Sequence, residues 1–168
     1  LAGSVSVFLR QRALFTFTLA AGAASWLMGN LLWLGGFSVY EVVPWWAGFL
    51  VLTIAGERLE LSRFLPPSPV AQRVFIAVLA GLTFGMAFEA RLFGAALVAL
   101  SLWLLRQDIA RRTVRDKGLK RFIAVCLLSG YGWLLLAGAI ILGAGLVPGS
   151  AAYDAALHAL MLGFVFSM

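Results

Sequence analysis

The chain has 168 residues, of which 62% are hydrophobic and only 12% are charged, against about 25% charged residues in soluble domains. This composition excludes an ordinary soluble domain. The formal net charge of +6 does not indicate a nucleic-acid-binding protein, because the basic residues lie at the ends of apolar segments. The single cysteine, Cys126, excludes an intramolecular disulfide and a cysteine-rich zinc site.

Apolar segments follow one another along the whole chain, at residues 13–36, 43–56, 70–88, 92–105, 122–146 and 155–168. They predict an all-α integral membrane protein with five full transmembrane helices and a partial span at each end, forming a single transmembrane helical domain over residues 1–168. Residues 154–168 would cover only about 22 Å of a hydrocarbon core about 30 Å thick. We therefore expect the chain to be a fragment of a longer protein.

The basic residues fall on one side of the predicted membrane when the spans alternate in direction. Only Arg91 lies on the other side, with Glu41, Glu89 and Asp154. Loops rich in Lys and Arg stay in the cytoplasm, so the pattern predicts a multi-pass protein of the bacterial inner membrane. The residues on the cytoplasmic side are Arg10, Arg12, Arg58, Arg63, Arg73, Arg106, Arg111, Arg112, Arg115, Lys117, Lys120 and Arg121.

Seven of these basic residues lie in one hairpin, residues 106–121, which we call the basic hairpin. We expect the fourth span to continue through it as a helix as far as Arg115, with Gly118 as the C-terminal cap. The hairpin has two interpretations, contact with anionic lipid headgroups or docking of a partner subunit.

Asn30 is an isolated amide at membrane depth in the first full span. We expect its side chain to form a hydrogen bond to a neighbouring helix, because such bonds are common between helices in lipid. A role in binding a ligand is the alternative.

The second span is predicted to begin with Pro44 at its first helical position, where the missing N–H costs nothing. Glu57 follows Trp45 by about 18 Å of helix, which places its carboxylate within the cytoplasmic leaflet. Ionisable groups at that depth are costly and are candidates for function. The alternative is an ordinary charged helix end at which Arg58 reaches the headgroups. Ser68 is predicted to cap the third span.

The last segment holds the only histidine, His158, four residues after Asp154 on the same helix face. A neutral imidazole there is suited to ligate haem or copper, and Met161, three residues further on, offers a thioether. A packed, hydrogen-bonded histidine is the alternative. The chain has no nucleotide-binding loop, zinc-protease motif or Ser–His–Asp set, so we assign no catalytic residue.

Several stretches together resemble the NnrS-like family of bacterial polytopic membrane proteins. They are WWAGF at 45–49, GERLELSR at 56–63, LLRQDIARRTV at 104–114 and HALMLGFVFSM at 158–168. The resemblance implies a many-spanning protein associated with haem or copper and linked to respiration or nitric-oxide stress. It also implies metal binding by membrane histidines, of which His158 is the one that matches here.

Two rival functions stay open beside this one. The first is a non-catalytic accessory subunit of a larger respiratory or photosynthetic membrane complex. The second is a small-molecule or ion transporter whose path would be lined by the polar residues Asn30, Glu57 and Tyr131.

Overall fold

The computed structural model describes residue 3, residues 13–61 and residues 68–168, and these described residues form helices without strands. Five helices are long and apolar enough to cross a membrane, which confirms the predicted all-α membrane fold. They are α2 (Leu14–Leu34), α3 (Val39–Leu61), α4 (Pro69–Phe88), α5 (Ala90–Gln107) and α7 (Leu119–Ala144). The predicted N-terminal partial span and Arg10, Arg12 and Arg63 lie outside the described residues.

The chain divides into two compact units, Leu1–Arg63 and Phe64–Met168. In the N-terminal unit, α2 and α3 form an antiparallel pair whose small residues allow close approach. A Cβ atom at Gly56 would lie 2.9 Å from Leu19 Cγ, and one at Gly29 would lie 2.9 Å from Trp46 Cδ1. The glycines therefore set the distance between these two helices.

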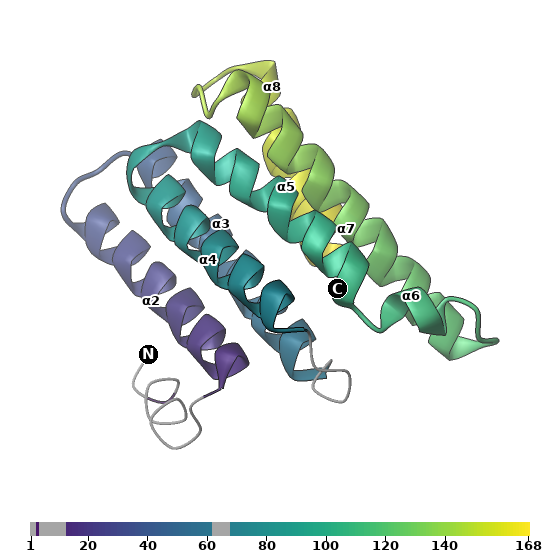
Figure 1. The fold of residues 1–168 in the computed structure, drawn as a ribbon. Coiled ribbons are helices and arrows are strands. Elements are labelled where there is room, and N and C mark those ends of the chain that lie inside the picture. Colours follow the sequence, from purple (N-terminus) through teal and green to yellow (C-terminus); the bar gives the residue numbers. More distant parts are fainter. Residues whose placement is uncertain (1–2, 4–12, 62–67) are drawn as a thin grey trace. The chain divides into compact units, whose positions relative to one another are not determined.

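In the C-terminal unit, α5 packs against both α4 and α7 (Figure 1). Trp103 of α5 donates an indole hydrogen bond to the Ala71 carbonyl of α4, at 2.9 Å, and its ring lies 4.6 Å from the Phe75 ring. Between α5 and α7 the backbones themselves meet, because a Cβ at Gly94 would lie 2.5 Å from the Leu142 nitrogen. The α5–α7 pair is thus closely packed, with backbone against backbone.

The start of α3 differs from the prediction, because Pro44 lies inside the helix rather than at its first position. The Glu41 carboxylate accepts hydrogen bonds from the Ser38 backbone nitrogen, at 2.9 Å, and the Ser38 hydroxyl, at 2.8 Å. This local cap lets the helix begin at Val39, ahead of the proline. The predicted cap of the next helix is confirmed, since Ser68 Oγ accepts from the Ala71 nitrogen at the start of α4.

The basic hairpin also differs from the prediction of one helix continuing to Arg115. Helix α5 ends at Gln107, Asp108 is extended, and a separate short helix α6 (Ala110–Thr113) follows. The Asp108 carboxylate accepts the Ala110 N–H at 2.8 Å, and this bond turns the backbone out of the helix. Gly118, with φ of 71°, precedes and caps α7 instead of ending the earlier helix.

The end of the chain is a composite helix. It comprises α8 (Ala151–His158), a π-helix η2 (Ala159–Phe164) and a 3₁₀ turn η3 (Val165–Ser167). Ser150 starts α8 by accepting a hydrogen bond from the Tyr153 nitrogen at 3.1 Å. The whole segment packs against α7.

Candidate functional site

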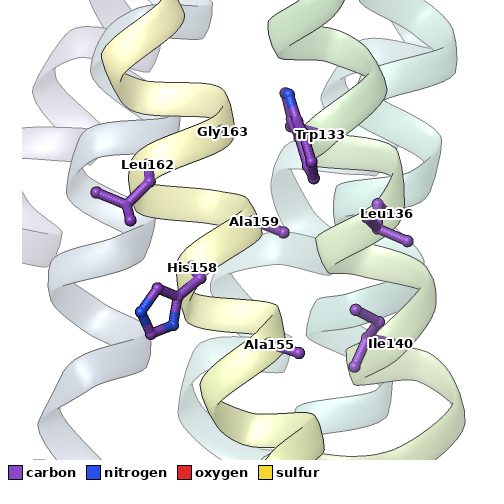
Figure 2. Close-up of a pocket in the computed structure, with 8 residues that line it drawn as sticks. All are labelled: Trp133, Leu136, Ile140, Ala155, His158, Ala159, Leu162 and Gly163. Atoms are coloured by element: carbon purple, nitrogen blue, oxygen red, sulfur yellow. The ribbon is translucent and has the colours of Figure 1, made fainter.

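A groove of about 440 Å³ runs between α7 and the α8–η2 segment (Figure 2). Trp133, Leu136 and Ile140 of α7 form one side of it. On the other helix, Ala155 and Ala159 face α7, while His158 and Leu162 project from the flank turned away from α7 (Figure 2). The lining is apolar except for the imidazole and the Trp133 indole, so the groove suits a largely apolar ligand.

The groove coincides with the change from α-helix to π-helix directly after His158. Gly163 of η2 lies against Trp133, and a Cβ atom at this glycine would overlap the indole ring. Short π-helical segments are rare and occur frequently at functional sites. The sequence pattern did not predict this segment, because its apolar residues fit an ordinary α-helix equally well.

The imidazole of His158 is oriented by its own helix. Its Nδ1 lies 2.7 Å from the Asp154 carbonyl oxygen, and since that oxygen can only accept, the ring proton is on Nδ1. In its neutral form the ring then carries its lone pair on Nε2. Many metal-binding histidines have the same arrangement, in which the other ring nitrogen donates to a backbone carbonyl. The side chain is exposed, so Nε2 is accessible from outside the helix.

Asp154 and Met161 are the other candidate residues of this segment. Asp154 contributes its backbone oxygen, and its own side chain is exposed. Met161 is half-buried in η2 and is not among the groove's lining residues. Within the described residues, no group of three or more His, Cys, Asp and Glu side chains is placed to hold a metal ion. His158 is thus a candidate ligand outside any such group in the described part of the chain.

The Asn30 amide forms a hydrogen bond within its own helix. The Nδ2 group donates to the Trp26 carbonyl at 2.9 Å, and the predicted bond to a neighbouring helix stays a prediction. The carbonyl four residues earlier is within reach of a short amide side chain and has a second lone pair to accept it.

Glu57 and Arg58 lie in the last turns of α3, where Glu57 is exposed and Arg58 is half-buried. Asn30 lies near the end of α2, and because α2 and α3 are antiparallel, Glu57 lies at the opposite end of the pair. The structure does not bring these two residues together.

Tyr131 is fully buried, and its hydroxyl donates to Asp108 Oδ2 at 2.5 Å. Asp108 is only 5% exposed, and Ser101 donates to the Tyr131 carbonyl at 2.6 Å. Sequence reasoning missed Asp108 as a partner of Tyr131. The available signal was an acidic residue among basic ones, just past the end of an apolar span.

Five helices of spanning length and hydropathy, following one another along the chain, make this a polytopic membrane protein. A family model described as "Domain of unknown function (DUF8744)" matches residues 1–168, so the chain belongs to that family. No curated protein and no solved structure matches the chain.

Proposed function

We propose that this DUF8744 member is an NnrS-like protein of the bacterial inner membrane that holds haem through His158. The observation that carries the proposal is the bond between His158 Nδ1 and the Asp154 carbonyl, which leaves Nε2 as the nitrogen available to a ligand on the exposed flank of the α8–η2 segment (Figure 2). The resemblance of residues 158–168 to NnrS-like proteins supports the same residue.

The donor set favours haem over a closed copper site. Haem iron needs only one or two axial protein ligands, whereas a closed copper site needs several donors close together. The described residues hold no cluster of three His, Cys, Asp or Glu side chains, and the Met161 thioether does not share the groove with His158. The groove volume, about 440 Å³, is within the usual range for small-molecule sites.

Bound haem iron would supply diatomic-gas binding or electron transfer, which fits a role in respiration or nitric-oxide stress. The chain's own contribution is to fix the imidazole tautomer through the Asp154 carbonyl. Copper is the alternative metal, with its further ligands supplied by a partner.

The test is a reduced-minus-oxidised optical spectrum of the full-length protein purified from its own membranes. Wild type is expected to show a haem band, and His158→Ala to lose it by at least about tenfold, because the axial bond is removed. Asp154→Asn is the matched control and should retain the band, since only the backbone oxygen of this residue contacts His158. A wild-type protein without haem absorbance, or a His158→Ala protein with full haem content, would contradict the proposal. Metal analysis of the same samples then separates copper from no metal.

We also propose that the basic hairpin faces the cytoplasm and contacts anionic lipid headgroups or a partner subunit. Its basic side chains at Arg106, Arg111, Arg112, Arg115, Lys117, Lys120 and Arg121 are all exposed. This exposure favours an accessory-subunit role as the second candidate function, because a charged surface at the end of a pair of packed helices is available to a partner. The transporter function has less support, since Asn30 and Glu57 lie at opposite ends of their helix pair.

A further inference from the structure

A second groove, of about 630 Å³, lies where α5 ends and the basic hairpin begins. Its lining combines three leucines, Leu102, Leu105 and Leu128, with two arginines, Arg106 and Arg111. The residues come from α5, α6 and α7, all in the C-terminal unit. The groove therefore joins an apolar surface to a cationic one at the end of two membrane-spanning helices.

The two charged groups are held next to each other. Arg111 Nη1 donates to the Arg106 carbonyl at 3.3 Å, which bridges the break between α5 and α6. Guanidinium groups have five N–H donors in a planar fork, so this bond leaves donors on Arg111 for an anion. The orientation of Arg111 is thus partly set before any ligand binds.

The acidic residue between these arginines in sequence is directed elsewhere. Asp108 is buried and accepts hydrogen bonds from the Ala110 nitrogen and the Tyr131 hydroxyl. Its carboxylate is bonded to α6 and α7, whereas both arginine side chains are exposed. The groove is consequently a site of positive charge.

The apolar residues extend from the arginines toward the membrane interior. Leu102 lies four residues before Arg106, so both are on one face of α5, and Leu102 is 53% exposed. A ligand that contacts the whole groove must carry an anionic group at headgroup depth and a hydrocarbon chain below it. Anionic phospholipids have this chemistry, and they are abundant where basic residues meet the bilayer surface.

We infer that the groove formed by Leu102, Leu105, Leu128, Arg106 and Arg111 binds an anionic phospholipid, with its phosphate on the arginines and an acyl chain on the leucines. The inference rests on the part of the proposed function that places the basic hairpin at the headgroups, and it does not depend on haem. Lipid, rather than a partner subunit, is then the occupant of this groove.

The experiment is native mass spectrometry of the full-length protein titrated with phosphatidylglycerol or phosphatidylcholine. Wild type is expected to retain phosphatidylglycerol preferentially. Arg106→Gln/Arg111→Gln should weaken this retention about tenfold or more, because it removes both guanidinium groups that line the groove and would bind the phosphate directly. The matched control, Arg115→Gln/Lys117→Gln, removes the same charge from the same hairpin outside the groove and should change retention less than about twofold.

Equal losses in the two double variants would contradict a defined groove while leaving the headgroup contact of the proposed function intact. A wild-type protein with no preference for phosphatidylglycerol would contradict both. If glycerol phosphate displaces phosphatidylglycerol at a concentration similar to that of the lipid, the groove is a site for soluble anions, and the inference of a phospholipid site is contradicted. If, with no anionic lipid present, a second protein co-purifies with wild type but not with Arg106→Gln/Arg111→Gln, the groove binds a partner subunit, and the inference is overturned.

A second variant tests the apolar part independently of the charges. Leu102→Ala shortens an exposed side chain, so folding should be preserved, as a thermal unfolding curve would check. It is expected to weaken retention of long-chain phosphatidylglycerol and to leave a short-chain analogue unaffected. Equal effects on both lipids would contradict the placement of the acyl chain.

Discussion

At the scale of single residues, the C-terminal unit depends on a buried tyrosine–carboxylate contact. Tyr131 of α7 donates to Asp108 at the end of α5, and Asp108 also receives the first N–H of α6. Burial removes the water that would solvate a carboxylate, and hydrogen-bond donors of the protein must replace it. A buried carboxylate that lacks these donors is destabilised. The contact therefore stabilises both the α5–α7 packing and the break that forms the basic hairpin.

Tyr131→Phe is expected to lower the free energy of unfolding by about 1–3 kcal/mol, because it removes a hydrogen bond to a buried carboxylate. A double-mutant cycle with Asp108→Asn isolates this contact from the loss of either side chain alone. Reversible unfolding in mixed detergent, followed by circular dichroism, is the measurement. Strictly additive single effects would show that the two side chains do not interact.

At the scale of helices, glycines let the backbones of α5 and α7 approach closely. A Cβ atom at Gly138 would lie 2.8 Å from the Val98 nitrogen, while nothing lies within 4 Å of one at Gly132 in the same helix. In lipid, association depends on close backbone approach more than on burial of apolar surface from water. The position of a glycine along α7, rather than its presence, thus determines its role.

Gly138→Ala is expected to destabilise the protein by about 1–3 kcal/mol, because the added methyl group forces α5 and α7 apart. Gly132→Ala is the matched control. It should be neutral or should stabilise by up to about 1 kcal/mol, since alanine has the higher helix propensity and this site has space. Both variants are compared by unfolding in the same detergent series. A Gly132→Ala protein that unfolds as readily as Gly138→Ala would contradict the close contact between α5 and α7 at Gly138.

At the scale of the whole molecule, hydropathy alone was enough to predict the five spanning helices, because each is a long apolar run bounded by charge or proline. The hairpin was mispredicted because its helix break depends on Asp108, whose second partner, Tyr131, is 23 residues away. Pro44 was misplaced because the Ser38–Glu41 cap precedes it. His158 stays a prediction from the sequence, and its Nδ1 bond to the carbonyl four residues earlier lies within its own helix. The π-helix after it was not predicted, because its apolar residues fit an ordinary α-helix equally well.

The alternation of spans predicts the arrangement of the loops across the membrane. Helix α7 separates the basic hairpin from the loop before α8, so Lys117 and Val147 should lie on opposite sides. The test uses a Cys126→Ser background and a membrane-impermeant maleimide applied to intact spheroplasts. The reagent should label Val147→Cys and also Phe37→Cys, which lies in the α2–α3 connection. The wild-type side chains at these positions are 57% and 50% exposed.

Lys117→Cys, by contrast, should react only after the membrane is permeabilised. The three sites together test the number of crossings, because one span separates positions 117 and 147, and three spans, α3, α4 and α5, separate positions 37 and 117. An even number of crossings in either interval would put two of these cysteines on the same side. If Lys117→Cys and Val147→Cys are both labelled in intact spheroplasts, α7 does not cross the membrane. If only Lys117→Cys is labelled, the orientation of the protein is opposite to the one that the positive charges predict.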